Sequence, residues 1–244
     1  MTRNQHYIFI LCFRPNPLPH KQDSMPRSFV LWLHGLGDSG PANEPIKTRF
    51  TSPEFKFTKW SFPSAPNSPV TCNGGYVMPS WFDVLEIPVT AYVHALIDKE
   101  VAAGSDPKNV FVCGLSQGGA LMLASVLLYP KTLGGGAVFS GWVPFNPSLI
   151  EKFTADARKT PILWSHGTAD RTVLFEAGQA GPPLLEQAGI SCEFKKWTKF
   201  PIKIRAHFTI ATDNPVRLLP MFWPLRPSNF QGKSTGPGMP FCRK

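Results

Sequence analysis

The segment Gly114–Gly118 constrains the fold of this chain more than any other feature. It reads Gly-Leu-Ser-Gln-Gly, so glycines stand two positions before and two positions after Ser116. Glycine on both sides lets a backbone reverse so tightly that larger side chains would collide. The apolar run Asn109–Cys113 before it predicts a buried strand, and Ala120–Leu128 after it predicts a helix. Strand, sharp turn and helix, in this order, raise a serine hydroxyl above the edge of a sheet.

Ser116 has two interpretations at this stage: a nucleophile for acyl transfer, or a serine that merely caps the following helix. Capping does not explain glycines on both sides, so we expect the nucleophile. Acyl transfer also needs N–H donors for the developing oxyanion, commonly one directly after the nucleophile and one in an early strand loop. Gln117 holds the first position. Leu36, in the loop His34–Asp38 after the apolar run Phe29–Leu33, holds the second.

Strand and helix patterns alternate along the chain, which predicts the α/β class with a mostly parallel sheet and helices on both faces. Between Pro63 and Pro79, prolines and glycines exclude long regular elements. The predicted strands are Phe29–Leu33, Thr58–Phe62, Asn109–Cys113, Gly136–Ser140, Pro161–His166 and Ser191–Trp197. The predicted helices are Tyr92–Ala103, Ala120–Leu128, a segment near Ser148–Ala157 and a segment near Pro183–Ala188.

The two ends of the chain differ in composition from its centre. Residues 1–27 contain four prolines, which predicts an irregular leader. Residues 195–244 contain ten Lys and Arg and one acid, whereas the remaining 15 basic and 15 acidic residues cancel, so the net charge of +9 lies in this tail. We expect one domain over 28–197 and a basic, proline-rich tail over 198–244. Its prolines leave no room for a long terminal helix.

Charge and cysteine content argue against several classes of protein. The basic charge comes without a nucleic-acid-binding motif, so no nucleic-acid partner is predicted. Five cysteines, widely spaced and without a Cys-x-x-Cys pair, indicate neither a disulfide framework nor a zinc site and favour a reducing, cytoplasmic compartment. The apolar stretch Tyr7–Phe13 is far too short to span a membrane. A peripheral alternative remains: docking on anionic lipid through the basic tail and Met221–Trp223.

An acid and a histidine should follow Ser116 in this order if it is a nucleophile in such a fold. Three residues separate Asp170 from the end of the predicted strand Pro161–His166, so we expect Asp170 at the same sheet edge, where it would orient a histidine. Its alternative role is to cap the segment that follows. His207 is the only histidine beyond Asp170. However, the alternation over Ile202–Ile210 puts it mid-strand beside two cations, which disfavour the protonated imidazole.

Three further histidines lie inside the predicted domain. His34 belongs to the early loop, His94 to a predicted helix and His166 to the end of a predicted strand. None has metal-ligand partners at a recognisable spacing, so we expect packed or hydrogen-bonded histidines and predict no metal and no cofactor.

From Phe29 to Trp197 the chain resembles the acyl-protein thioesterase and lysophospholipase group of small carboxylesterases, especially its plant members. The resemblance implies a compact α/β-hydrolase fold and no cofactor. It implies hydrolysis of fatty-acyl thioesters on proteins or of lysophospholipid esters, with Ser116 as nucleophile and Asp170 as acid. The segments that carry it, in order, are Leu33–Asp38, Pro63–Pro66, Trp81–Asp83, Gly114–Ala120, Ser140–Trp142 and His166–Asp170.

The chain departs from that family in its leader, at the short join Thr90–Tyr92, and after Trp197. There the family continues into a Gly-His-Ser segment with its catalytic histidine and a final helix, whereas Thr198–Phe200 begins something different. The comparison with the family therefore implies that this fold lacks its last helix. Two hypotheses follow. Either the chain is an active serine hydrolase whose base is His207, or it is a catalytically impaired variant that keeps only acyl binding.

Overall fold

The structure is a computed structural model, and it describes the central part of the chain and two short outlying strands. The described residues are 28–50, 55–83, 90–144 and 147–197, with β1 (Phe9–Leu11) and β10 (Val216–Leu218). These two strands pair antiparallel. His207 and the place of the predicted missing helix lie outside the described residues.

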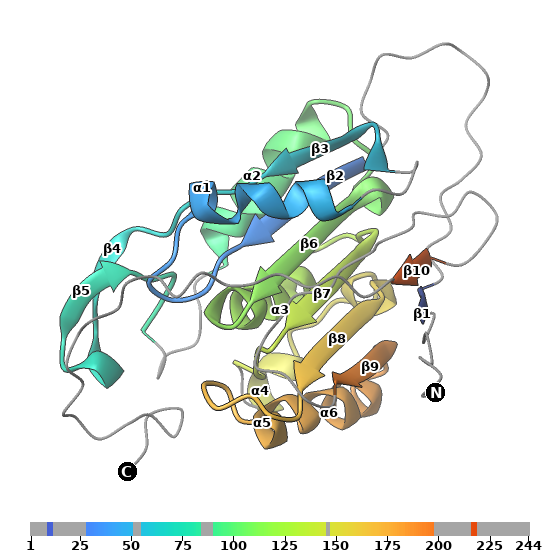
Figure 1. Cartoon of the computed structure of the whole chain (residues 1–244). Helices are drawn as coiled ribbons and strands as arrows, with labels where there is room; N and C mark the ends of the chain where they lie inside the picture. The colour runs from blue at the N-terminus through green and yellow to red at the C-terminus, as the bar shows by residue number, and fades with distance from the viewer. Residues whose placement is uncertain are drawn as a thin grey trace, which may run out of the picture.

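Six strands form the central sheet in the order β3-β2-β6-β7-β8-β9 (Figure 1). Every neighbouring pair is parallel, so the carboxyl ends of all six strands lie at one edge. The predicted α/β class with a mostly parallel sheet is confirmed, and each predicted strand end lies within two residues of the observed one. The strands are β2 (Ser28–Leu33), β3 (Thr58–Ser61), β6 (Val110–Leu115), β7 (Gly135–Phe139), β8 (Ile162–Gly167) and β9 (Cys192–Trp197).

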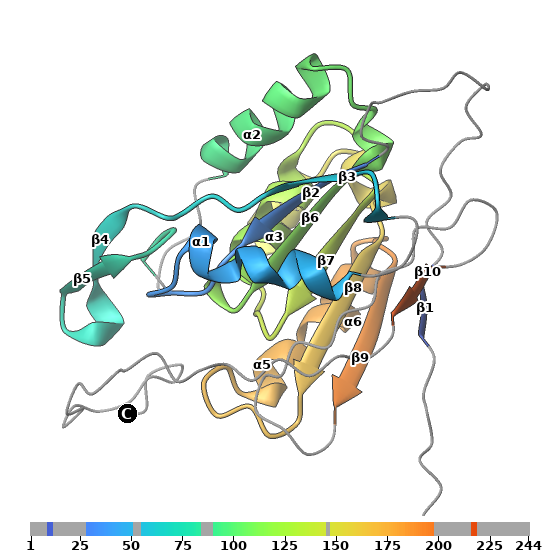
Figure 2. The same cartoon turned by 45° about the horizontal axis from the view of Figure 1, so that its top comes forward.

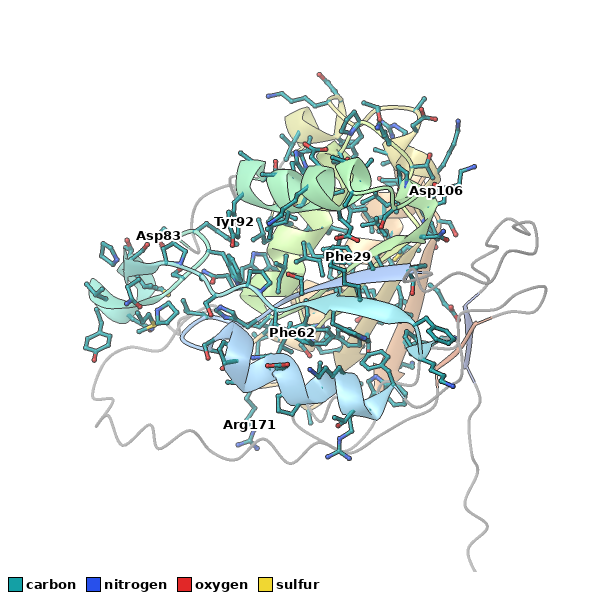
Figure 3. The ribbon with its side chains drawn as sticks, turned by 90° about the horizontal axis from the view of Figure 1, so that it is seen from above. Phe29, Phe62, Asp83, Tyr92, Asp106 and Arg171 are labelled. Atoms are coloured by element: carbon teal, nitrogen blue, oxygen red, sulfur yellow. The ribbon has the colours of Figure 1, made fainter. Side chains whose placement is uncertain are left out.

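Side chains of the central strands alternate between two apolar layers, one on each face of the sheet. In β2, Phe29 packs in the layer that contains residues of α2 (Ala91–Ala102) and α3 (Gln117–Leu128). Its neighbour Val30 packs in the opposite layer. That layer also receives Ile46 from the 3-10 helix η1 (Glu44–Arg49). This 3-10 helix directly follows the short helix α1 (Gly40–Asn43), and Figure 3 shows both on the face of the sheet opposite α2.

Three of the four predicted helices are present, and one prediction is wrong. The predictions for α2, α3 and α6 (Gly181–Gln187) hold, but Ser148–Ala157 contains only α4 (Pro147–Ile150) before the 3-10 turn η5 (Ala157–Lys159). The guanidinium of Arg158 donates to the carbonyl oxygens of Ile150 and Phe153, which a continuing helix would use itself. Periodicity also did not reveal α1, η1 or α5 (Phe175–Gln179).

A short antiparallel hairpin, β4 (Asn67–Val70) and β5 (Tyr76–Pro79), projects beyond the carboxyl edge of the sheet (Figure 2). The 3-10 turn η3 (Thr71–Asn73) and two glycines with positive φ join its strands. Each strand has only four residues, in agreement with the expectation for this proline- and glycine-rich stretch. No helix among the described residues is long and apolar enough to cross a membrane.

Candidate active site

Ser116 stands between β6 and α3 in a conformation that L residues rarely adopt, with φ 52° and ψ −118°. A non-glycine residue held at such angles stores about 1–3 kcal/mol of strain. The flanking glycines are a steric necessity. A Cβ at Gly114 would lie 2.1 Å from the carbonyl oxygen of Gly118, and one at Gly118 would lie 2.2 Å from that of Leu33. The Ser116 side chain forms no capping hydrogen bond with α3, so the capping interpretation is wrong.

Backbone hydrogen bonds fix the turn on both sides of Ser116. Its N–H donates to the carbonyl oxygen of Phe139 at the end of β7, at 2.8 Å. Its carbonyl oxygen accepts from the N–H groups of Gly119 at 2.9 Å and Ala120 at 3.1 Å. Because a peptide unit is planar, these bonds also fix the direction of the Gln117 N–H. That N–H lies in the first turn of α3 and therefore has no partner inside the helix.

The early loop lies directly against this turn. A Cβ built on Gly35 would stand 3.6 Å from Cβ of Ser116 and 3.6 Å from the carbonyl oxygen of Leu115. The next residue, Leu36, donates no backbone hydrogen bond within the described part of the chain. The structure thus brings together the two segments that carry the predicted oxyanion donors, Leu36 and Gln117, beside Ser116.

His34 is fully buried and holds this loop from inside. Its Nε2 accepts from the N–H of Ala65 at 2.9 Å, and its Nδ1 bonds the carbonyl oxygen of Gly35 at 2.7 Å. A carbonyl can only accept, so these partners assign the neutral tautomer with the proton on Nδ1. Burial lowers the pKa of His34 below its ordinary value of 6.5, against the opposing effects of the Gly35 hydrogen bond and the charge of Asp38.

Two side chains to which the sequence analysis gave no role, those of Gln117 and Trp81, connect the loop and the turn. Oε1 of the buried Gln117 accepts from the backbone N–H of Trp81 at 3.1 Å. Its Nε2 donates to Oγ of Ser80 at 2.9 Å and to the carbonyl oxygen of Phe82 at 2.7 Å. The indole N–H of Trp81 donates to the carbonyl oxygen of His34 at 2.8 Å. The sequence signal that could have revealed Trp81 was the Trp81–Asp83 segment. This segment contributed to the family resemblance, but no role was assigned to its residues.

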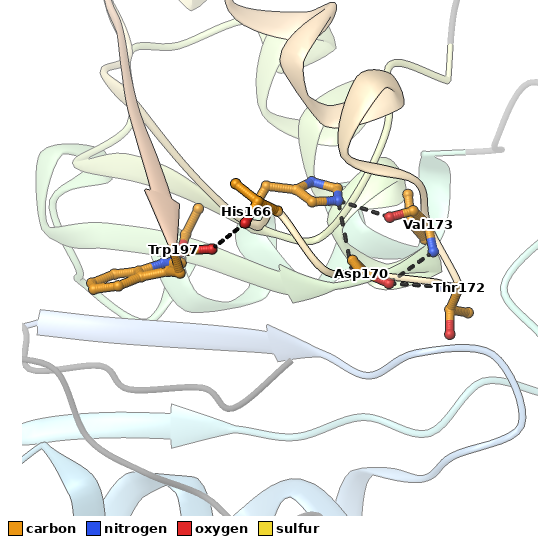
Figure 4. Close-up of polar contacts among 7 residues, drawn as sticks. His166, Asp170, Thr172, Val173 and Trp197 are labelled. Atoms are coloured by element: carbon orange, nitrogen blue, oxygen red, sulfur yellow. Dashed lines mark hydrogen bonds and ion pairs between the residues drawn. The ribbon is translucent and has the colours of Figure 1, made fainter. Parts of the chain in front are cut away.

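Asp170 follows β8 in the expected loop at the carboxyl edge, and its two oxygens have different surroundings (Figure 4). Oδ1 accepts from the N–H groups of Thr172 at 2.9 Å and Val173 at 3.1 Å, which is the capping alternative. Oδ2 is buried and has no hydrogen-bond partner among the described residues. Nε2 of His166 lies 3.8 Å from it, beyond hydrogen-bonding distance. One carboxylate oxygen therefore stabilises the loop, and the other remains available to a donor.

The other histidines of the described domain are packed and hydrogen-bonded, which confirms the expectation for them. Nε2 of His94 bonds the carbonyl oxygen of Ser125 at 2.8 Å, and Nε2 of His166 bonds that of Val173 at 2.9 Å. Among the described residues, no group of three or more His, Cys, Asp or Glu side chains could hold a metal ion. His207, the predicted base, lies outside these residues, so its place in the site stays a prediction.

Comparison with known proteins agrees with this geometry. The family model described as Phospholipase/Carboxylesterase matches residues 20–205. A probable carboxylesterase, SOBER1-like, of Arabidopsis thaliana is 66% identical over 190 residues, which cover 72% of each chain. The acyl-protein thioesterase 1 of Cryptococcus neoformans is 34% identical over 181 residues, 68% of this chain and 74% of that one.

The crystal structure of Arabidopsis thaliana SOBER1 superposes with a TM-score of 0.70 at 62% identity. The match covers 73% of this chain and 91% of that one. Sequence, family model and structure therefore agree that this chain belongs to the phospholipase/carboxylesterase family of α/β-hydrolases.

Proposed function

We propose that this chain hydrolyses carboxylic esters and thioesters with Ser116 as its nucleophile. The observation that carries the proposal is the left-handed backbone of Ser116, packed against the Gly35–Leu36 loop and followed directly by the Gln117 N–H. Residues held in such strained conformations cluster at functional sites. Ser140, with a φ of 48°, is the other described non-glycine residue with a positive φ. The family's named carboxylesterases and acyl-protein thioesterases perform this class of chemistry.

In the proposed mechanism, Oγ of Ser116 attacks the acyl carbonyl while a histidine takes its proton. The carbonyl oxygen becomes an oxyanion, which the N–H groups of Leu36 and Gln117 stabilise. The histidine then protonates the leaving alcohol or thiol, and an acyl-enzyme remains on Ser116. A water molecule, deprotonated by the same histidine, releases the carboxylic acid and restores the serine hydroxyl.

Asp170 is proposed to orient that histidine. Its buried Oδ2 has no hydrogen-bond donor among the described residues. In a catalytic triad, the acid accepts a hydrogen bond from an imidazole N–H. Because β7 separates β6 from β8, the strand ends that carry Ser116 and Asp170 are about 10 Å apart, which leaves room for an imidazole between them. His207 is the only histidine of the sequence beyond Asp170, and we propose it as the base.

The substrates proposed are acylated proteins and lysophospholipids. The thioesterase name of the Cryptococcus neoformans relative supports the first, and the family resemblance supports the second. The cysteine pattern supports a cytoplasmic location. The basic tail supports peripheral contact with anionic lipid.

A fluorophosphonate probe tests the proposal, because it phosphonylates only an activated serine. We expect labelling of the folded wild-type protein that disappears in Ser116→Ala and persists in Ser191→Ala, a change of an exposed serine. Hydrolysis of p-nitrophenyl acetate and of an S-acyl thioester should follow the same pattern. Absence of labelling in folded protein would overturn the proposal in favour of a variant that only binds acyl groups.

The variant His207→Ala tests the base separately. If His207 is the base, labelling and turnover both fall by three orders of magnitude or more, as for loss of a triad member. Labelling and turnover that survive this change would assign the base elsewhere while leaving Ser116 as the nucleophile.

A further inference from the structure

We infer that His34, Trp81 and the side chain of Gln117 form one hydrogen-bonded unit that sets the direction and separation of the two oxyanion donors. The inference rests on the proposed function. It assigns positioning roles to three side chains that do not themselves reach the reacting atoms.

The first donor, the Leu36 N–H, is oriented through the opposite end of its own peptide unit. The Gly35 carbonyl and the Leu36 N–H belong to one planar peptide and point in opposite directions. The Gly35 oxygen accepts from Nδ1 of His34 at 2.7 Å and from the N–H of Asp38 at 3.2 Å. These bonds prevent rotation of the peptide plane, and they also polarise the Leu36 N–H, which strengthens it as a donor.

The second donor, the Gln117 N–H, is held in an equivalent way. The Ser116 carbonyl of the same peptide accepts from Gly119 and Ala120 at 2.9 and 3.1 Å. Beyond this, the Gln117 side chain uses its amide oxygen and its amide nitrogen to bind the segment Ser80–Phe82 through three hydrogen bonds. The first residue of α3 is therefore tied to a segment that lies outside both the turn and the early loop.

Trp81 joins the two halves. Its backbone N–H donates to Gln117, while its indole N–H donates to the carbonyl oxygen of His34 at 2.8 Å. The rings of Trp81 and His34 also lie in contact, with centroids 4.8 Å apart. On the far side, the Ala65 N–H fixes Nε2 of His34 at 2.9 Å. A continuous path of hydrogen bonds thus runs from one oxyanion donor to the other.

The expected consequence is specific to the transition state. Oxyanion donors act on the position that the charged oxygen reaches, not on the ground-state carbonyl. Loosening the unit should therefore lower kcat and leave KM nearly unchanged, because substrate binding does not use these bonds. Loss of a whole donor costs about 10²–10³ in kcat, so displacing one should cost roughly tenfold.

Trp81→Phe tests the inference, because it removes the indole N–H and keeps an aromatic ring. Trp164→Phe is the matched control: Trp164 is fully buried, and its indole nitrogen has no hydrogen-bond partner among the described residues, so only volume is lost. With p-nitrophenyl acetate, we expect kcat to fall about tenfold in Trp81→Phe at unchanged KM. Trp164→Phe should lower the melting temperature and keep kcat within twofold. Wild-type kcat in Trp81→Phe, or an equal loss in both folded variants, would overturn the inference.

A second readout does not depend on turnover. In ¹⁵N–¹H spectra, the amide resonances of Leu36 and Gln117 should both move in Trp81→Phe and stay in place in Trp164→Phe. If the wild-type protein shows no Ser116-dependent hydrolysis, the proposed function fails, and this spectrum alone decides the inference. Unmoved resonances in Trp81→Phe would then overturn it, and movement of both would support it.

Discussion

Nε2 of His166 lies 3.8 Å from Oδ2 of Asp170, beyond hydrogen-bonding distance, and the same nitrogen instead bonds the carbonyl oxygen of Val173 at 2.9 Å. The N–H at Nε2 of His166 therefore donates its hydrogen bond to the backbone and not to the acid. A buried polar atom without a partner is rare in folded proteins and calls for an explanation. The proposed one is that Oδ2 of Asp170 serves the catalytic histidine.

Replacement of Asp170 by Asn should lower kcat for p-nitrophenyl acetate by about 10⁴, as expected when a triad acid no longer selects the right histidine tautomer. The loop should survive, because the Asn amide oxygen can still accept from Thr172 and Val173. Asp156→Asn, at an exposed aspartate paired with Lys159, is the control and should keep full activity. Comparable activity in Asp170→Asn and the wild type would remove Asp170 from the mechanism.

Replacement of Gly118 by Ala should disrupt the domain although Gly118 lies inside a helix, where Ala is normally favoured by about 1 kcal/mol. The new Cβ would stand 2.2 Å from the carbonyl oxygen of Leu33, and neither backbone can retreat without opening the sheet. Denaturant unfolding should show a loss of several kcal/mol or no folded protein.

Gly189→Ala is the comparison for Gly118. Its φ of +76° is strained for Ala, but nothing lies within 4 Å of the new Cβ. The cost there should be only about 1–2 kcal/mol. If Gly118→Ala were no more destabilising than Gly189→Ala, the close approach of the turn and β2 would be refuted.

Acid should destabilise the protein through His34. Burial lowers its folded-state pKa, so below about pH 6.5 the unfolded chain binds a proton more readily than the folded one. The free energy of unfolding therefore falls as the pH drops from about 6.5 and stops falling, for this group, below the folded pKa. The stabilising effect of the neutral His34 is fully present above about pH 6.5.

His34→Gln removes the titration, so the measurement is the difference in unfolding free energy between wild type and variant across pH 4–8. Contributions common to both proteins cancel in that difference. We expect the advantage of the wild type to shrink with acidification. A difference that is constant or grows with acidification contradicts the assigned neutral tautomer.

The buried Cys113 and the half-buried Cys192 should be nearly inert to alkylation in the folded protein. Burial, with the nearby charges of Glu186 and Glu193, raises the pKa of Cys192 to about 12, and burial alone raises that of Cys113 further. At pH 8 about one in 10⁴ Cys192 side chains is then a thiolate, against roughly a quarter for an ordinary thiol. Mass spectrometry after iodoacetamide treatment should find both modified in urea but spared without it. Native modification at the urea rate would contradict the raised pKa of these thiols.

The turn at Ser116 and the strands around it were predictable because their signals are local. The signals are two glycines at fixed positions, the apolar run before them and the helical run after them. Each depends on a few consecutive residues, so this one segment determines its own backbone conformation. The same reasoning placed Asp170 after β8. It failed for Ser148–Ala157, where the N–H groups of Lys152 and Phe153 bond three residues back instead of four, and Arg158 donates to the carbonyl oxygens of Ile150 and Phe153.

The sequence by itself determined the α/β class, the strand order along the chain and the identities of Ser116, Asp170 and the two loop segments beside them. Only the tertiary structure decided how Gln117 reaches Trp81, 36 residues earlier in the chain, and how Trp81 reaches His34, 47 residues earlier. These contacts form because His34 and Gln117 follow β2 and β6, whose carboxyl ends meet at one edge of the sheet, and the segment after the antiparallel strand β5 lies against that edge. No local pattern encodes which buried polar side chains will find each other there.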